Sequence, residues 1–352
     1  MRKTIMSELT CFKAYDIRGK LGIDINSKIV YRIGRAVTQH FRANQVVVGW
    51  DARQTSSEFA DAVSNGIQDA GGCALNIGMC GTEEMYWGVT QFKADAGIII
   101  TSSHNPINYN GMKIVKSKSQ PLHEEKDLKA IKRIAETELF KEATRRGRIA
   151  DRSLEARAAY VDKVLSFIDI SALTPLKIVV NSGNGAAGPT FDAITKKLST
   201  MNSPLDFIRI NHNPDSSFPN GIPNPLLLKN HAATGEVVKK VGADFGVAFD
   251  GDFDRCFFFD NNGNFVQGEY IVGLLAAIFL DKELGGTVVH DPRVIWNTKS
   301  VIAGKGGVAV QSKTGHAFIK QAMRTHKAIY GGEISAHHYF RDFSYCDSGM
   351  IT

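Results

Sequence analysis

A short polar segment, TSSHNP at residues 101–106, places serine hydroxyls directly beside an imidazole. The residues before it, AGIII at 96–100, form the apolar, β-branched run that is typical of a buried strand. In open α/β sheets, ligands bind where the strands end. A serine such as Ser103 becomes a nucleophile when a neighbouring base or charge activates it, and His104 and Lys113 are the nearest candidates. A lone Ser-His pair is more often an ordinary turn, so this segment alone does not decide the function.

A second polar segment, DGDFDR at residues 250–255, also follows an apolar run and carries three carboxylates at alternate positions, Asp250, Asp252 and Asp254. Carboxylates this close repel one another unless a cation lies among them, and ligation by oxygen alone suits a hard ion such as Mg²⁺ or Ca²⁺. The spacing matches the opening of a calcium-binding loop, but Arg255 replaces its glycine and Asn261 replaces its closing glutamate. The sequence therefore predicts a site for a hard divalent cation in a loop of a different kind.

Together these segments resemble the α-D-phosphohexomutases, the family of phosphomannomutases and phosphoglucomutases. In that family, the loop T-x-S-H-N-P carries a serine that is phosphorylated in the active enzyme, and D-G-D-x-D-R holds Mg²⁺. The resemblance extends from FKAYDIRG, residues 12–19, to GGEISAHHYFRDFSYCDSGM, residues 331–350. It therefore covers nearly the whole chain, which looks most like the bacterial phosphomannomutases that supply GDP-mannose for surface polysaccharide.

The resemblance implies a reaction and a role for each matching residue. Ser103, carried as a phosphoserine, would interconvert mannose 1-phosphate and mannose 6-phosphate through a hexose 1,6-bisphosphate, which is also the activator. Ser103 and the three aspartates would hold Mg²⁺, and His104 and Lys113 would move the hydroxyl proton. Binding of the substrate and its phosphates is expected of eight further residues: Tyr15, Arg18, Arg255, Arg293, His316, Glu333, Ser335 and His337.

Composition indicates an ordinary globular enzyme of 352 residues, with 43% hydrophobic and 22% charged residues and a formal net charge of +6. The basic clusters at 129–133 and 145–148 lack interleaved aromatic residues, so we expect solvated helix faces and no nucleic-acid partner. Five cysteines without C-x-x-C spacing argue against a disulfide framework and for a cytoplasmic location. The longest apolar run, 271–280, predicts a buried helix and no membrane span. The expected partners are small hexose phosphates, and the expected assembly is a monomer or dimer.

Strands and helices alternate in three successive rounds, which predicts an α/β fold with parallel or mixed sheets covered by helices on both faces. The expected strands are 45–50, 74–77, 96–100, 176–180, 206–210, 245–249, 287–290, 308–311 and 328–330. The expected helices are 57–70, 124–138, 190–198, 235–241, 269–280, 295–303 and 316–324. We expect three domains, a phosphoserine-loop domain at 1–148, a metal-loop domain at 149–256 and a sugar-recognition domain at 257–352. By the family resemblance, they would surround one cleft.

Other functions compete with this interpretation. Gly183, Gly185 and Gly188 satisfy G-x-G-x-x-G between an expected strand and an expected helix, which is the fingerprint of an NAD-dependent dehydrogenase. The fingerprint also needs an acidic residue at the end of the next strand, where Asn211 stands. We therefore favour a tight turn whose small residues allow close packing. Phosphoglucomutase activity and an inactive sugar-phosphate-binding form remain as alternatives.

The sequence ends at Thr352, directly after YCDSGM, where the family continues into a fourth domain of about a hundred residues. In the family, that domain grips the phosphate that does not react. Binding energy from such a remote group orients the reacting hydroxyl. We therefore expect this chain to lack the fourth domain and to turn over hexose phosphates more slowly than a full-length relative.

Overall fold

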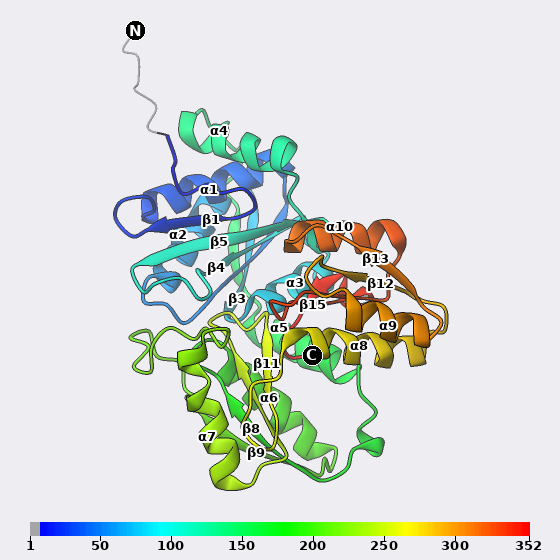
Figure 1. Ribbon diagram of the computed structural model, residues 1–352. Helices are drawn as coiled ribbons and strands as arrows, with labels where there is room; N and C mark the ends of the chain where they lie inside the picture. Colours follow the sequence, from blue (N-terminus) through cyan, green and yellow to red (C-terminus); the bar gives the residue numbers. More distant parts are fainter. Residues whose placement is uncertain (1–7) are drawn as a thin grey trace. The chain divides into compact units, whose positions relative to one another are not determined.

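The computed structural model describes residues 8–352, and its contacts divide the chain into two compact units, residues 1–159 and 160–352. The division falls within helix α5 (Ser153–Leu165). The first unit contains one sheet and the second contains two, each with helices packed on it (Figure 1).

The first unit is built on a seven-stranded mixed sheet in the order β1-β5-β4-β2-β3-β7, with β6 paired to β5. Its strands are β1 (Ile17–Lys20), β2 (Gln45–Trp50), β3 (Cys73–Met79), β4 (Ala96–Ile100), β5 (Tyr109–Lys116), β6 (Gln120–Pro121) and β7 (Arg148–Asp151). Its helices are α1 (Ser27–Phe41), α2 (Ser56–Asp69), α3 (Thr82–Gln91) and α4 (Lys129–Thr137), the last preceded by a π-helical turn at Glu124–Leu128. The pairing is parallel among β2, β3, β4 and β7, and antiparallel wherever β5 takes part.

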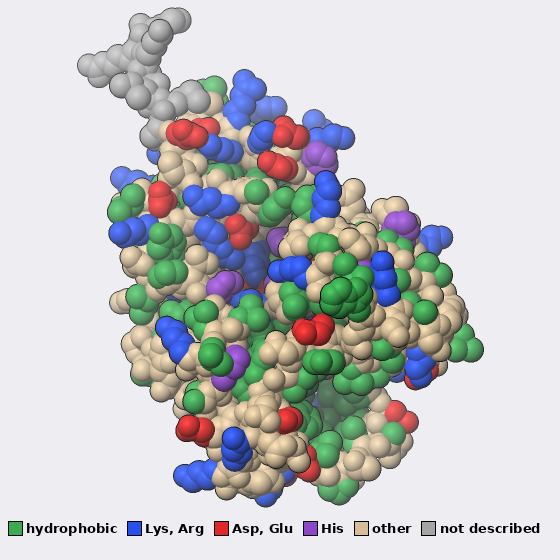
Figure 2. Space-filling model, viewed as in Figure 1, with side chains coloured by type: hydrophobic (Ala, Val, Ile, Leu, Met, Phe, Trp, Pro, Cys, Tyr) green, Lys and Arg blue, Asp and Glu red, His purple; other side chains and the backbone are tan. Residues whose placement is uncertain are grey.

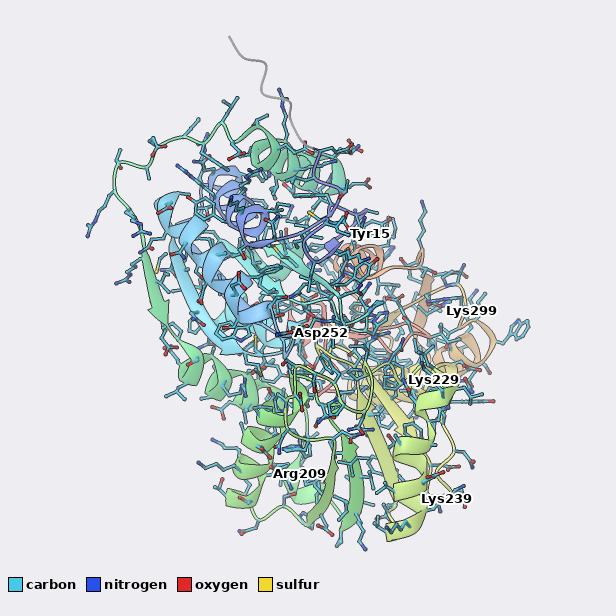
Figure 3. All side chains as sticks on the ribbon, turned by 90° about the vertical axis from the view of Figure 1, so that its left-hand side faces the viewer. Tyr15, Arg209, Lys229, Lys239, Asp252 and Lys299 are labelled. Carbon is cyan, nitrogen blue, oxygen red and sulfur yellow. The ribbon has the colours of Figure 1, made fainter. Side chains whose placement is uncertain are left out.

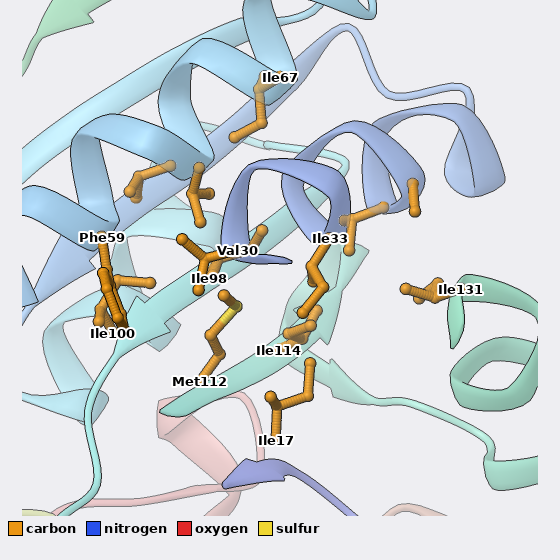
Figure 4. Close-up of a cluster of buried hydrophobic side chains, with 14 of the residues drawn as sticks. Ile17, Val30, Ile33, Phe59, Ile67, Ile98, Ile100, Met112, Ile114 and Ile131 are labelled. Atoms are coloured by element: carbon orange, nitrogen blue, oxygen red, sulfur yellow. The ribbon is translucent and has the colours of Figure 1, made fainter. Parts of the chain in front are cut away.

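Helices cover both faces of this sheet, which explains why every residue of β4 is buried. Ile98 and Ile100 point toward α1 and α2, where they meet Met112 and Ile33 in the main apolar core (Figure 4). Gly97 points to the opposite face, where an added Cβ would lie 2.5 Å from the sulfur of Met85 in α3. The strand that precedes the Ser103 loop is therefore held from both sides.

The second unit begins with a four-stranded sheet in the order β11-β10-β8-β9. Its elements are β8 (Leu176–Asn181), α6 (Ala187–Thr200), β9 (Leu205–Ile210), α7 (Ala232–Val241), β10 (Phe245–Phe249) and β11 (Cys256–Phe259). Strands β8, β9 and β10 are parallel, so their carboxyl ends lie at the same edge. Only β11, which follows the aspartate loop, runs antiparallel.

A five-stranded sheet in the order β13-β12-β14-β15-β16 completes the second unit. Its elements are α8 (Gly268–Lys282), β12 (Thr287–His290), α9 (Trp296–Gly304), β13 (Val308–Gln311), α10 (His316–His326), β14 (Tyr330–Gly332), β15 (His338–Phe340) and β16 (Cys346–Asp347). Strand β14 is parallel to β12, whereas β15 and β16 return in antiparallel pairs.

The structure confirms the predicted α/β class with mixed sheets, and five predicted strands, β2, β4, β10, β12 and β13, have the predicted bounds. The strand predicted at 328–330 is displaced, because β14 runs through Gly331 and Gly332. Glycine usually weakens strands, but here an added Cβ at Gly331 would lie 2.7 Å from the sulfur of Met323, so close packing requires it. Helices α1, α3 and α5 were not predicted either, and α3 is buried on nearly all sides, which removes the usual helical period.

The sheets continue a few residues beyond the expected domain boundaries at 148 and 256. Strand β7 extends the first sheet to Asp151, and β11 extends the second sheet to Phe259. The predicted buried helix at 271–280 is only partly buried, because Tyr270, Leu274 and Ile278 are exposed on the face of α8 that points away from its sheet. None of the described helices is both long enough and apolar enough to cross a membrane.

The basic cluster at 129–133 lies on α4, at the top of Figure 2, where lysine and arginine side chains alternate with acidic ones. Lys129 pairs with Glu125 and Lys132 with Glu136, so this is a solvated helix face, as predicted. All five cysteines lie in the described residues and are free thiols.

The glycine fingerprint forms a tight turn between β8 and α6. An added Cβ at Gly188 would lie 2.0 Å from the carbonyl oxygen of His212, and one at Gly185 would lie 2.8 Å from that of Gly251 in the aspartate loop. The glycines therefore serve close backbone packing, which agrees with the interpretation that we favoured over a dinucleotide site.

Substitution of Gly188 by alanine should lower the melting temperature, because the backbone at His212 must move; overpacking of this kind typically costs about 1–3 kcal/mol. The matched control is Gly304→Ala in α9, where no atom lies within 4 Å of the added Cβ. That change should leave the melting temperature unchanged or raise it, since alanine favours helix. Equal effects of the two substitutions in thermal unfolding would contradict the packing role of Gly188.

Candidate active site

Ser103 lies in the loop that follows β4, and its backbone is in the left-handed region with φ of 47°. A non-glycine residue in a sparsely populated region costs on the order of 1 kcal/mol and must be held by its surroundings. The hydroxyl of Thr101 accepts a hydrogen bond from the Ser103 amide at 2.8 Å. The Ser103 Oγ lies 3.1 Å from Nδ1 of His104, as the sequence predicted for neighbouring groups.

Arg53 holds the backbone of the Ser103 loop, and it was not among the site residues predicted from the sequence. Its guanidinium donates to the carbonyls of Ser103 (2.9 Å), Asn105 (2.5 Å), Pro106 (2.9 Å) and Tyr109 (3.0 Å). The side chain is only 3% exposed, and its Nε lies 3.6 Å from the carboxylate of Asp51. Burial raises the pKa of Asp51, and the charge of Arg53 opposes that shift. One buried arginine therefore fixes the shape of the Ser103 loop.

Two other predicted residues lie near the base of the same loop. Arg18, on β1, donates to the carbonyl of Thr101 and pairs with Asp16 at 3.0 Å. Lys113 lies on β5, where it is the cross-strand partner of Ile99 and faces away from the α1 and α2 side of the sheet. Tyr15 precedes β1 and is 42% exposed (Figure 3).

The aspartate loop links β10 to β11 and lies at the carboxyl end of the second sheet. Figure 3 shows Asp252 at this end of the sheet, opposite to Lys239 near the end of α7. Asp250, Asp252 and Asp254 are at most 2% exposed, and one oxygen of each lies within 4.8 Å of the others. The sequence prediction that these three carboxylates converge is therefore confirmed.

Arg255 lies against this cluster and is 4% exposed. It donates to one oxygen of Asp250 through two nitrogens, at 3.0 and 2.7 Å. Burial alone would lower the pKa of Arg255, but Asp250 and Asp254 outweigh it and raise the pKa further. Arg255 therefore stays charged and offsets one of the three carboxylates.

The loop keeps its shape through contacts with neighbouring segments of the same unit. The amide of Ala186, at the start of α6, donates to the carbonyl of Gly251 at 3.2 Å. Phe253 adopts φ of 46° and is fully buried, which turns the aspartates on either side of it toward each other. This geometry fits a metal ion, because three converging, buried carboxylates concentrate negative charge that a hard divalent cation would neutralise.

The third loop joins β14 to β15 and carries Glu333, Ser335 and His337. Glu333 accepts a hydrogen bond from the Tyr339 hydroxyl and lies 3.6 Å from Arg293. Asp291, which is fully buried, accepts from Nε of Arg293 at 3.0 Å and thereby directs the guanidinium. The predicted residues Glu333 and Arg293 are therefore brought together, although they lie far apart in the sequence.

The third loop also meets the aspartate loop. His337 Nδ1 lies 2.7 Å from Asp347 and 3.9 Å from Asp254. Burial works to lower the pKa of His337, but Asp254 and Asp347 outweigh it and raise the pKa. For Asp347 the balance is the reverse: burial would raise its pKa, but Lys320 and His337 hold it well below the ordinary value. Asp347 and Lys320 were not among the predicted site residues.

Ser335 is half-buried in the middle of the third loop, and His316 is the first residue of α10. The second unit therefore contains the aspartates, Arg255, Arg293, His316, Glu333, Ser335 and His337. The first unit contains Ser103, His104, Lys113, Tyr15 and Arg18. Ser103 and His104 in the first unit and the predicted groups of the second unit follow the carboxyl ends of strands, as expected for α/β sheets, whereas Arg18 and Lys113 lie on strands and Tyr15 precedes one.

Comparison with known families matches three successive descriptions along the chain. These are the phosphoglucomutase/phosphomannomutase alpha/beta/alpha domains I, II and III, at residues 10–142, 158–263 and 267–352. The chain belongs to the phosphoglucomutase/phosphomannomutase family. The aspartate loop lies in domain II and the Ser103 loop in domain I of this family.

Curated relatives of this family member support the same assignment. The phosphomannomutase of Salmonella montevideo is 53% identical over 346 residues, which are 98% of this chain and 76% of the relative. The phosphomannomutase of Escherichia coli K12 is 52% identical, again over 98% of this chain and 76% of the relative. Phosphohexose mutases of Xanthomonas campestris are 48% identical over 97% of this chain and 75% of the relative. The family member is therefore an enzyme of the phosphohexomutase type.

Solved structures share the fold. A phosphoglucomutase/phosphomannomutase family protein of Burkholderia thailandensis gives a TM-score of 0.89 at 28% identity, covering 99% of this chain and 75% of that one. A putative phosphomannomutase of Thermus thermophilus gives 0.87 at 23% identity, covering 99% of this chain and 78% of that one.

Replacement of Arg53 by glutamine should destabilise the first unit strongly, because it leaves Asp51 buried beside four carbonyl groups that lose their donor. Removal of one partner from a buried ion pair typically costs about 3–5 kcal/mol. The matched control is Arg146→Gln, because Arg146 pairs with Asp69 while 62% exposed. An exposed pair contributes less than about 1 kcal/mol. Urea unfolding that gave similar losses for both variants would show that Arg53 does not hold the loop.

Replacement of Asp252 by asparagine should weaken Mg²⁺ binding sharply in calorimetric titration while the fold persists. The change keeps the shape of the side chain but removes one of the converging charges. Without Mg²⁺ the melting temperature should stay the same or rise, because like charges in a buried cluster repel. Asp260→Asn, at an exposed turn of the same unit, is the control and should leave Mg²⁺ affinity unchanged. Equal affinity for wild type and Asp252→Asn would mean that the aspartates are structural.

Proposed function

We propose that the protein interconverts mannose 1-phosphate and mannose 6-phosphate, with Ser103 as the phosphoryl carrier. The observation that supports this most strongly is the 53% identity to a phosphomannomutase over nearly the whole chain, together with a strained serine loop and a buried carboxylate cluster. The product of such a reaction, mannose 1-phosphate, would supply GDP-mannose for polysaccharide. We also propose that the reaction takes place in the cytoplasm, which the free cysteine thiols support.

In the proposed reaction, Ser103 gives its phosphoryl group to the free hydroxyl of a hexose phosphate. The bond between phosphorus and the Ser103 oxygen breaks, a bond to the sugar oxygen forms, and the hydroxyl proton passes to a base. The hexose 1,6-bisphosphate then turns end for end and returns its other phosphoryl group to Ser103. Covalent transfer divides one exchange into two matched steps, so each half of the cycle uses the same groups.

Residues of the first unit would support this transfer. His104, whose Nδ1 lies 3.1 Å from the Ser103 oxygen, and Lys113 are the proposed proton carriers. Arg53 would act through the backbone, since its bonds to the carbonyls of Ser103 and Asn105 keep the serine in its strained conformation. Arg18, which holds the carbonyl of Thr101, and Tyr15 are proposed to contact the substrate.

The second unit would supply the charge that phosphoryl transfer requires. We propose that Asp250, Asp252 and Asp254, with a phosphoserine oxygen of Ser103, hold Mg²⁺. When bound, Mg²⁺ offsets negative charge on the group being transferred, which in such reactions contributes much of the rate. Arg255 would add a donor pair to the same phosphate, because its guanidinium already lies against the cluster.

The remaining residues would bind the sugar and its second phosphate. Glu333 is fixed by Tyr339 and Arg293, so its carboxylate is oriented to accept hydrogen bonds from sugar hydroxyls. Ser335 and His337 belong to the same loop, and Arg293 and His316 would bind phosphate or hydroxyl oxygens. The sugar hydroxyls that the Glu333 loop would contact occur in both mannose and glucose phosphates, so phosphoglucomutase activity is the second candidate.

The proposal can be tested by phosphorus-detected NMR of the purified protein with mannose 1-phosphate, Mg²⁺ and a trace of mannose 1,6-bisphosphate. Mannose 6-phosphate should accumulate with wild type and with Ser102→Ala but not with Ser103→Ala. Ser102 is the matched control because it is the neighbouring buried hydroxyl. Intact-mass measurement should show a phosphate-sized addition that only Ser103→Ala abolishes. Turnover by Ser103→Ala would refute the proposed carrier, and faster conversion of glucose 1-phosphate would favour the second candidate.

A further inference from the structure

The segment CDSGM, residues 346–350, packs directly on the aspartate loop. An added Cβ at Gly349 would lie 2.5 Å from the carbonyl oxygen of Phe253 and 3.0 Å from the carbonyl carbon of Arg255. Met350 packs against the apolar cluster that contains Phe253. This segment therefore supports the aspartate loop through backbone contact, and no chemistry is yet assigned to it.

Asp347 of this segment takes part in a buried chain of charged groups. Its carboxylate lies 2.7 Å from Nζ of Lys320 on one side and 2.7 Å from Nδ1 of His337 on the other. Lys320 and Asp347 are each 1% exposed. The same Nδ1 of His337 lies 3.9 Å from Asp254. This row of buried charged groups therefore extends from the interior of the third sheet to the edge of the aspartate loop.

Burying such a row of charged groups costs free energy, so the row contributes little to the stability of the fold. Each buried charge gives up its hydration, and well-packed apolar residues would often serve stability as well or better. A lysine is almost never fully buried unless it is paired. Lys320 lies one helical turn after the start of α10, beside the buried apolar residues Ile319 and Met323. Its presence is more readily explained by a requirement for charge on Asp347.

The contact with Asp347 determines which nitrogen of His337 faces a ligand. Nδ1 is engaged by Asp347, and the His337 side chain is 21% exposed whereas Asp347 and Asp254 are nearly inaccessible. Nε2, on the other side of the ring, is therefore the nitrogen that remains for a substrate. A carboxylate on one imidazole nitrogen fixes the proton position and the orientation of the ring, as it does for histidines that bind metals.

The hairpin that carries His337 is closed by the bond from the amide of Glu333 to the carbonyl of His337 at 2.9 Å. Ala336, between them, is in the left-handed region with φ of 67°. The loop backbone therefore holds Glu333 and His337 in a set relation, and the His337 ring itself is held by the bond to Asp347 and by stacking on Tyr339.

We propose that Asp347 and Lys320 are positioning residues of the mutase reaction: Asp347 holds His337 by Nδ1 so that Nε2 donates to an oxygen of the bound hexose phosphate, and Lys320 keeps Asp347 in place. This rests on the proposed function, because it names how that site orients its substrate. In this proposal Lys320 acts through Asp347, and Asp347 acts through His337.

The test combines kinetics with nitrogen-15-labelled histidine. In the wild type, the His337 Nδ1 proton should give a strongly downfield resonance that disappears in His337→Gln, which assigns it. Asp347→Asn should shift this resonance upfield and lower kcat/KM by about 10- to 100-fold, the usual effect of removing a partner of this kind. Lys320→Met should have a smaller effect in the same direction. Lys305→Met, at an exposed pair with Asp281, is the matched control and should change neither reading.

A double-substitution cycle separates positioning from simple stabilisation. If Asp347 acts through His337, then Asp347→Asn should cause little further loss in the His337→Gln background, because the ring that it orients is gone. Additive losses would overturn the proposal, as would an unchanged Nδ1 resonance in Asp347→Asn. If Asp347→Asn does not fold, the same cycle with Lys320→Met decides, and additive losses again count against it.

Failure of the proposed function would have a different signature. Titration of wild type with mannose 1-phosphate should shift the Nε2 resonance of His337, whether or not turnover occurs. Absence of both turnover and binding would refute the proposed function. Binding and turnover with no shift at Nε2, or with no sensitivity to Asp347, would leave that function intact and refute the positioning role.

Discussion

Repulsion among buried carboxylates is the constraint on which the second unit depends. Asp250, Asp252 and Asp254 converge within 4.8 Å, and Asp347 and Glu333 lie close by. Such groups remain ionised in the interior only if positive charge reaches them. Three basic side chains supply it: Arg255 pairs with Asp250, Arg293 in the loop after β12 lies near Glu333, and Lys320 on α10 pairs with Asp347. The remaining negative charge is what makes the loop suited to a divalent cation.

The Ser103 loop, the aspartate loop and the loop from β14 to β15 have one backbone feature in common. Each follows a buried strand and contains one non-glycine residue in the left-handed region, Ser103, Phe253 and Ala336. A single residue of this kind reverses the chain within a few positions and brings side chains on either side of it together. The strain is small beside the contacts that hold each loop, which come from Arg53, from the glycine turn before α6 and from the Glu333 to His337 hydrogen bond.

The sequence predicted β4 and β10 and the loops that follow them, because both signals are local. A β-branched run such as 96–100 marks a strand, and a sudden change to polar residues marks its carboxyl end. Asp347, Lys320 and Arg53 could not be found this way, because their roles depend on contacts between segments distant in sequence. Arg53 lies 50 residues before Ser103 in the sequence. Lys320 lies in α10, whose sequence pattern is that of an ordinary helix and does not mark this lysine as functional. The bounds of β14 were misplaced for a similar reason, since its glycines are explained only by the helices packed on them.

The four carbonyl contacts of Arg53 have a consequence for the proposed reaction, in which Ser103 would exist in two covalent states. All of them are to main-chain oxygens, and none involves the Ser103 hydroxyl. A phosphoryl group on the serine would therefore leave these four bonds in place. In the proposed reaction, a molecule that released its bisphosphate before the second transfer would be left with a dephosphorylated serine and with the Arg53 contacts intact. Rephosphorylation by a free bisphosphate would then require no rearrangement of these contacts, so the dephosphorylated form would be a reserve that can return to the cycle.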